Sequence, residues 1–151
     1  KKTAVLNLIV VGLKIPASYR LPTTTKPIHY KIYIWTDFES TDSISERMFG
    51  GDVEIRLTAT EVNVNEIVLH ANELDIISLT LTRGTENIPV TYAFDNPANH
   101  HFLKVKLTTG TLEYNAEQPV EYVLHIKYDA AMRTDMYGIY ESWYWVGDQL
   151  K

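Results

Sequence analysis

The sequence predicts an all-β domain in which antiparallel or mixed strands pack as a β-sandwich or as a saddle-shaped sheet. The chain of 151 residues carries ten tyrosines and three tryptophans, together with many valines, isoleucines and threonines. These residue types suit pleated, half-buried strands. Short segments of alternating hydrophobicity recur with turn residues between them, and no segment has a convincing helical period. A series of about seven to nine short strands is typical of antiparallel sheets packed face to face.

The first predicted strand, Ile28–Trp35, follows an extended lead-in that contains Pro22 and Pro27. Each proline lacks a backbone N–H and disfavours helix at the residue before it. Within the strand, Ile and Tyr at the even positions alternate with His, Lys, Tyr and Trp at the odd positions, which is the period of a strand. A polar connection ending in Gly50-Gly51 follows, and residues 41–48 within it are compatible with a helical turn.

Seven further segments are predicted to be strands because they are short, rich in β-branched or aromatic residues and bounded by turns. They are residues 52–59, 66–71, 74–81, 88–94, 102–108, 119–130 and 138–146. In the first of these, Val53, Ile55 and Leu57 are expected on one face and the residues between them on the other. Turns are predicted at residues 83–87 and 95–100.

Composition and charge exclude several classes of protein. The length fits one domain or part of one. The net charge of −5 gives no reason to expect nucleic acid as a partner, since phosphate binding relies on a basic surface. The absence of cysteine excludes a disulfide scaffold, a cysteine-based zinc site and a thiol nucleophile.

The first 18 residues differ from the rest of the chain. Two lysines precede an apolar run from Ala4 to Leu13, and the small residues Ala17 and Ser18 follow. This layout is typical of a secretory signal peptide whose initiator methionine is missing. The run is shorter than the roughly 20 residues that a membrane-spanning helix needs. A buried strand of the domain is the alternative interpretation of residues 1–18.

The five histidines do not have the spacing of a metal site. They are His29, His70, His100, His101 and His125. A zinc hydrolase needs two or three converging imidazoles, often as H-E-x-x-H on one helix, and that motif is absent. Single histidines within strands are expected to pack in the sheet, and the adjacent pair at the predicted turn lacks an evident third ligand. A nucleophile elbow of the type G-x-S-x-G and the phosphate-binding glycine motifs are also absent.

The most unusual local feature is the aromatic cluster near the end of the sequence. It consists of Tyr137, Tyr140, Trp143, Tyr144 and Trp145. Such a cluster can form a ligand-stacking or partner surface. We expect instead that one aromatic face of a strand is buried in the core and the other lies against a neighbouring domain.

Four short motifs between Tyr19 and Tyr144 have a characteristic order and spacing. The positions that carry them are Arg20, Leu21, Pro22, Pro27, His29 and Tyr30; Phe49, Gly51, Val53 and Ile55; Ile67, Leu69, His70, Leu74 and Ile76; and Gly138, Tyr140, Ser142 and Tyr144. Together they resemble the N-terminal domain of zinc aminopeptidases of the aminopeptidase N type, the gluzincins. That family removes N-terminal residues from peptides.

The resemblance implies that residues 19–151 form the N-terminal β domain and that this domain is incomplete at its C-terminus. In the family, the Gln-containing segment that binds the substrate amine, the exopeptidase loop and the zinc-binding helix all come later. The resemblance therefore implies no catalytic, cofactor-binding or metal-binding residue here, with zinc only in the missing catalytic domain. His70 is implied to be structural, and Gln149 stands too early for the substrate-binding role.

The implied partners are the catalytic domain of the same polypeptide, whose cleft this domain would wall on one side, and peptide substrates through the intact enzyme. The signal-like N-terminus fits an extracellular or cell-surface enzyme. A different class of function is a free-standing β-sandwich binding module without enzymatic activity, which the aromatic cluster and the missing catalytic motifs favour.

Overall fold

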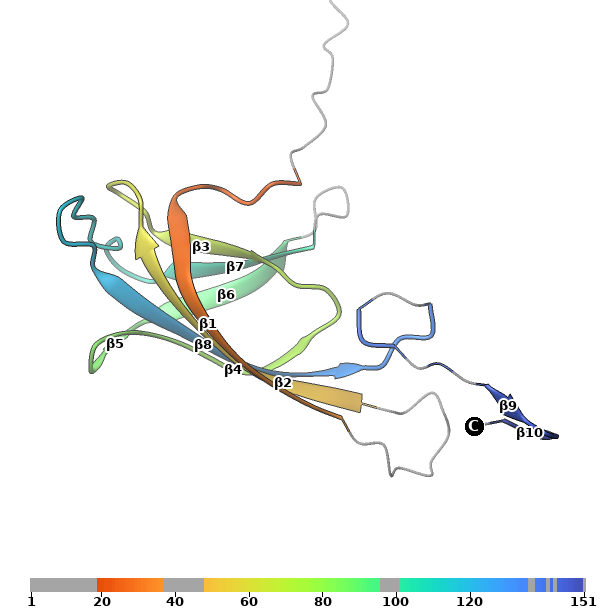
Figure 1. Cartoon of the computed structure of the whole chain (residues 1–151). Helices are drawn as coiled ribbons and strands as arrows, with labels where there is room; N and C mark the ends of the chain where they lie inside the picture. Colours follow the sequence, from red (N-terminus) through yellow and green to blue (C-terminus); the bar gives the residue numbers. More distant parts are fainter. Residues whose placement is uncertain are drawn as a thin grey trace, which may run out of the picture.

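The computed structural model of the chain describes residues 19–36, 48–95, 101–135, 138–140, 142 and 144–150 (Figure 1). Within these ranges the chain forms strands and no helix, which confirms the all-β prediction. It follows that no helix of the described ranges has the length and apolar character to cross a membrane. The strands are β1 (Thr25–Thr36), β2 (Met48–Ala59), β3 (Glu66–His70), β4 (Asp75–Arg83), β5 (Glu86–Ile88), β6 (Val90–Asp95), β7 (Phe102–Leu107), β8 (Glu121–Ala131), β9 (Trp145–Val146) and β10 (Gln149–Leu150).

The strands form two packed sheets and a small hairpin. The large sheet has the order β1-β2-β8-β4-β5, and the small sheet has the order β3-β7-β6. Every neighbouring pair in both sheets is antiparallel. Within the described part of the chain, strands β9 and β10 pair with each other and with no other strand. Figure 1 shows the small sheet lying over one face of the large sheet, so the architecture is the predicted sandwich.

Strand β8 is the centre of the large sheet because it pairs with β2 on one side and β4 on the other. Its side chains alternate with period two, as strand geometry requires. Tyr122, Leu124 and Ile126 are buried, whereas Lys127 on the opposite face is exposed. We call the face that carries Leu124 the inner face of the large sheet and the opposite face the outer face.

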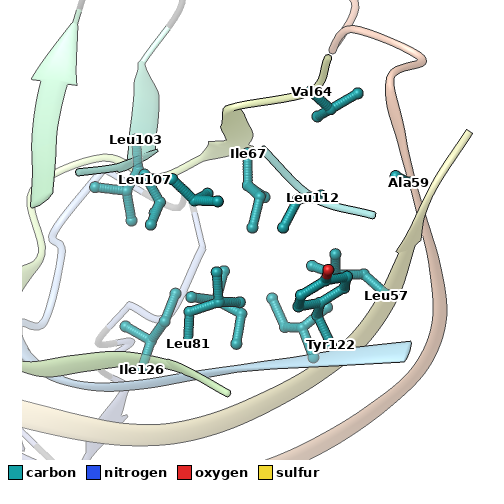
Figure 2. Packing of buried hydrophobic residues seen from close by; sticks show 13 residues of the cluster. Leu57, Ala59, Val64, Ile67, Leu81, Leu103, Leu107, Leu112, Tyr122 and Ile126 are labelled. Atoms are coloured by element: carbon teal, nitrogen blue, oxygen red, sulfur yellow. The ribbon is translucent and has the colours of Figure 1, made fainter. Parts of the chain in front are cut away.

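The hydrophobic core fills the space between the two sheets. Figure 2 shows Leu81, Tyr122 and Ile126 of the large sheet pointing toward side chains of the small sheet. The buried residues contributed by the small sheet are Ile67, Leu103, Val105 and Leu107. Apolar burial of this kind is the main favourable term in the stability of the fold.

A loop segment closes one end of the core. Leu112 is buried, and its backbone N–H donates to the carbonyl of Val64 at 2.7 Å. The hydroxyl of buried Tyr122 accepts a hydrogen bond from the N–H of Glu113 at 2.8 Å. The one polar atom of this ring is therefore paired, which removes the cost of burying it.

Two glycines occupy positions that the sequence assigned to a connection. Gly50 and Gly51 lie inside β2, paired with Trp35 and Ile34 of β1. A Cβ at Gly51 would overlap the ring of Tyr128, and a Cβ at Gly50 would overlap the ring of Trp35. The glycines are needed because aromatic rings lie directly on the backbone, and the prediction that they end a connection was wrong.

The predicted strands 28–35, 66–71, 74–81, 102–108 and 119–130 are confirmed with shifts in their ends. The predicted strand 88–94 and the predicted turn 83–87 are partly wrong, because Glu86–Ile88 form β5, which pairs with β4 in the large sheet, and Val90–Asp95 form β6, which pairs with β7 in the small sheet. The turn is limited to Gly84 and Thr85, and the turn predicted at 95–100 lies outside the described residues except for Asp95.

The last predicted strand differs more. Residues 138–146 were expected to be one strand. Instead Tyr140 forms a single bridge to Arg133, and regular pairing begins only at Trp145 in a hairpin with a left-handed glycine, Gly147. The possible helical turn falls mostly outside the described residues, and its last residue, Met48, begins β2.

The alternation of β8 predicts a large difference between two neighbouring positions. Leu124→Ala should lower the free energy of unfolding by about 2 to 5 kcal/mol, because it leaves a cavity at a fully buried site. Val123→Ala, on the outer face of the same strand, should cost roughly 1 kcal/mol. Urea unfolding of the two variants measures both values, and equal losses would contradict the assigned faces.

The packing of Tyr128 on β2 predicts a non-additive pair of substitutions. Alanine is normally better than glycine in a strand, but Gly51→Ala should destabilise by about 1 to 3 kcal/mol because its methyl group displaces the ring. In a Tyr128→Ala background the same change should cost much less. Chemical unfolding of the four members of this cycle measures the coupling, and identical costs in both backgrounds would refute the contact.

Candidate functional site

The described histidines lie in three places in the fold. His70 and His101 are neighbours at the end of the β3–β7 pair, where the N–H of Ala71 donates to the carbonyl of His101 at 2.8 Å, and the other two lie apart on the large sheet. His29 is exposed on the outer face of β1, and His125 lies on the outer face of β8. His70 ends β3, and His101 precedes β7 with a φ of 53°. His100 lies outside the described residues. Among the residues that the structure describes, no three His, Asp or Glu side chains come together in a way that would hold a metal ion.

Two of these histidines have partners that explain their positions. The Nε2 of His125 lies 2.5 Å from a carboxylate oxygen of Asp52 on β2. The Nε2 of His70 lies 3.0 Å from the carbonyl oxygen of Tyr19, to which it donates, and the His70 ring lies 5.1 Å from that of Phe102. His70 thus links the lead-in before β1 to the small sheet, which supports its implied structural role.

The described members of the aromatic cluster are exposed, contrary to the expected burial of one face. Tyr140, Tyr144 and Trp145 each leave a large part of their surface accessible, and Tyr137 and Trp143 lie outside the described residues. These side chains are exposed because β9 and β10, with two residues each, form a hairpin that extends neither sheet. Aromatic content alone therefore misled the prediction.

The largest exposed apolar feature on a regular strand is β1, which the sequence analysis did not single out. Every residue of this strand between its first and its last is exposed. The exposed fractions of the last four large side chains are 54% for Ile32, 58% for Tyr33, 51% for Ile34 and 46% for Trp35. Together with Ile28 and Tyr30 they form what we call the β1 apolar surface.

The β1 apolar surface has two sides. Ile32 and Ile34 are cross-strand partners of Val53 and Gly51, so they lie on the inner face. Tyr33 and Trp35 are partners of Asp52 and Gly50 and lie on the outer face. Continuous apolar character of this kind is typical of strands that are covered on both faces. The uninterrupted apolar run Ile32–Trp35 is therefore the feature of the sequence from which this surface could have been predicted.

The length of the strands explains why the inner face of the second half of β1 is uncovered. Strands β1 and β2 have 12 residues each, or about 40 Å. The strands of the small sheet have five or six residues, or roughly 16 to 20 Å. The small sheet therefore covers about half the length of the large one, and Figure 1 shows the second half of β1 running beyond it.

Three hollows lie at the surface of the sandwich, two of them between β1 and β3 and the third between the end of β8 and the segment that follows β3. One of about 430 Å³ and one of about 290 Å³ share Leu21, Tyr30 and Leu69 in their linings. A third, of about 560 Å³, shares Leu74 and Tyr128 with the second. Burial raises the pKa of the Tyr128 hydroxyl above its ordinary value. The hollows are lined mainly by apolar side chains, so they suit apolar side chains of a partner segment.

Charged groups border the third hollow. Arg133 lies 2.5 Å from Glu73 and 2.5 Å from Asp135, and the hydrogen bond to Asp135 raises the pKa of the guanidinium further above its usual range. On the outer face, Arg56 and Glu121 form an ion pair of 2.8 Å. These groups are exposed and paired with each other, so they stabilise the surface only weakly and do not form an acid–base pair aimed at a substrate.

The fold and the site thus define the class of protein. It is an all-β domain that presents an uncovered apolar strand, and in its described part no catalytic side chains converge. The comparison with protein families then identifies it. Residues 26–151 match the Peptidase M1 N-terminal domain, and the chain belongs to that family.

Curated relatives agree with this assignment. The chain is 45% identical over 130 residues to a membrane alanyl aminopeptidase of Heliothis virescens, a match covering 86% of this chain and 12% of that protein. It is 35% identical over 136 residues to a membrane alanyl aminopeptidase of Manduca sexta, and 30% identical over 134 residues to an aminopeptidase N of Plutella xylostella. Each of these two matches covers 84% of this chain and 13% of the relative. The chain thus spans about an eighth of the length of the relatives it matches.

The link between His70 and the lead-in predicts a change in proteolysis. His70→Phe retains a ring beside Phe102 but loses the hydrogen bond to Tyr19, next to the tryptic site after Arg20. Limited trypsin digestion should then cleave after Arg20 about two- to tenfold faster, which is the effect of losing one hydrogen bond. His29→Phe makes the same chemical change on exposed β1 and should leave the rate unaltered. Equal rates in the two variants would show that His70 does not hold the lead-in.

Proposed function

We propose that this chain is the non-catalytic N-terminal domain of a secreted or membrane-bound zinc aminopeptidase, and that it packs on the catalytic part of the same polypeptide and walls one side of the peptide-binding cleft. The observation that carries the proposal is that residues 26–151 of this chain match the Peptidase M1 N-terminal domain. The aminopeptidase relatives that share this segment are about eight times longer than it. The uncovered β1 apolar surface and the apolar hollows support it, because exposed patches of this kind mark interaction sites.

The chemistry of the intact enzyme belongs to the remainder of the polypeptide in this proposal. The described residues do not fit a catalytic zinc ion, because no three of its protein ligand types converge there. The domain itself supplies a surface, and its substrates are the peptides that the intact enzyme processes. Nucleic acid is not among the proposed partners, given the net charge of −5.

The proposed location is outside the cell or at its surface. Two of the relatives are named as membrane alanyl aminopeptidases, and residues 1–18 have the composition of a secretory signal. In this division of the chain, residues 1–18 are the signal and residues 19–151 belong to the β domain. N-terminal sequencing of the protein purified from its source tests the division, because processing should remove the signal.

A direct assay of peptidase activity tests the proposed function. The full-length polypeptide of the source gene should release N-terminal residues from peptides and should lose this activity with a chelator. The chain of residues 19–151 should release none, with or without added zinc, because the described residues hold no site for the metal. A heat-inactivated sample of the long polypeptide is the control for contaminating peptidases. Zinc-dependent release by residues 19–151 alone would overturn the proposal.

The same assay separates this proposal from a free-standing binding module. The exposed aromatic side chains Tyr140, Tyr144 and Trp145 are the observation that favours such a module. If the source gene encodes no peptidase activity at all, the module becomes the better account.

A further inference from the structure

The lead-in to β1 carries three consecutive threonines between two prolines. Thr23, Thr24 and Thr25 lie between Pro22 and Pro27. Threonine-rich segments with prolines are the composition in which secreted proteins carry sugars on side-chain hydroxyls. The prolines matter because each fixes its own φ and disfavours helix at the residue before it. The segment is therefore kept in an open conformation that a modifying enzyme can bind.

The structure separates the three threonines by their exposure. Thr25 begins β1 and pairs with Ala59 of β2, and both Thr25 and Thr24 are half-buried. Thr23 is exposed and lies in the bend before the strand. Its side-chain hydroxyl makes no hydrogen bond within the part of the chain that the structure describes. Thr23 is therefore the threonine of this run that a modifying enzyme can reach.

The backbone on either side of this hydroxyl is held by Thr60, the residue after β2. The hydroxyl of Thr60 donates to the carbonyl of Thr23 at 2.6 Å, and the N–H of Thr60 donates to the carbonyl of Thr24 at 2.9 Å. Both contacts use backbone oxygens of the lead-in, so they fix its course without engaging the side chain of Thr23. An acceptor presented in a fixed conformation loses little further entropy when an enzyme binds it.

We propose that Thr23 is an O-glycosylation site, which receives an N-acetylhexosamine from a nucleotide-activated sugar in the secretory pathway. The hydroxyl oxygen of Thr23 forms a bond to the anomeric carbon of the sugar. The bond from that carbon to the nucleotide diphosphate breaks, the diphosphate leaves with the electron pair, and the hydroxyl proton passes to a base of the transferase. Passage through the secretory pathway rests on the proposed function, whereas the choice of Thr23 rests on its exposure and its neighbouring prolines.

The site lies away from the second half of the β1 apolar surface. Thr23 precedes β1, and Ile32 lies roughly 30 Å further along the chain if the backbone is extended. Thr23 also helps to line the hollow of about 430 Å³, so a sugar on it extends beside that hollow. The sugar and a partner docked along Ile32–Trp35 therefore do not compete for the same surface.

Mass spectrometry of the full-length protein purified from its source tests the site. Trypsin cleaves after Arg20 but not before Pro27, so one peptide, residues 21–31, holds all three threonines. This peptide should carry the added mass of at least one N-acetylhexosamine, and fragmentation by electron transfer should place the sugar on Thr23. An unmodified peptide, a phosphate in place of the sugar, or a sugar confined to the other two threonines would overturn the proposal.

A second threonine cluster provides the internal control. Thr109 and Thr111 are exposed as well, but neither has a proline neighbour. Both lie in the tryptic peptide of residues 107–127, which should remain unmodified. Equal occupancy of that peptide by sugar would show that exposure alone decides, and it would overturn the assignment to Thr23.

A matched pair of variants tests the assignment in the protein expressed through the secretory pathway. Thr23→Val should lose the sugar from residues 21–31, whereas Thr109→Val should retain it. Valine has the shape of threonine and keeps the backbone contact to Thr60, so the first variant should fold. Sugar that remains on residues 21–31 of Thr23→Val would contradict the assignment. Since the unsubstituted protein already shows whether Thr23 is modified, a variant that is not secreted does not prevent the test.

The same preparation separates this site from the proposed function. A long, active peptidase that has lost residues 1–18 but carries no sugar on Thr23 would refute the site alone. A glycosylated Thr23 on a polypeptide without peptidase activity would support the site and refute the proposed function.

Discussion

The small sheet is too short to cover the large one, and this constraint governs what the rest of the structure does. Antiparallel strands of 12 residues in β1 and β2 face strands of five or six residues. Where the two sheets overlap, Leu81, Leu103 and Leu124 are buried completely or nearly so. Where they do not, side chains of the same kind are left in water. The exposure of the inner face in the second half of β1 is therefore a geometric consequence of strand length.

Aromatic rings also lie directly on the backbone in this half of the sheet. Gly50 and Gly51 let Trp35 and Tyr128 lie on β2, one on each face of the sheet. On the inner face the ring of Tyr128 partly replaces the missing layer by covering the backbone of Gly51, and on the outer face the ring of Trp35 covers Gly50. They do not cover the Ile and Tyr side chains of β1, and this remaining apolar area links the fold to the proposed docking role.

Sequence reasoning found the strands whose alternation matches a one-sided burial. Val53, Ile55 and Leu57 were assigned to one face of their strand, and the structure places them on the inner face with Ile55 and Leu57 in the core.

Sequence reasoning failed where the outcome depends on contacts distant in sequence. The inner-face exposure of Ile32 and Ile34 depends on the length of β3, β6 and β7. The aromatic run at 138–146 lacks a sheet to join in the described residues. The partners of His70 and His125 are likewise 51 and 73 residues away, beyond the reach of local patterns.

We propose above all that this domain is one part of a much longer polypeptide. A denaturing immunoblot of the source tissue, with an antibody raised against residues 19–151, measures this directly. The account predicts a band several times larger than the 17.3 kDa of this chain, in line with the relatives, of which the match covers only 12% or 13%. A single band near 17 kDa would contradict it, because no remainder of the polypeptide would then exist to carry the chemistry or to cover β1.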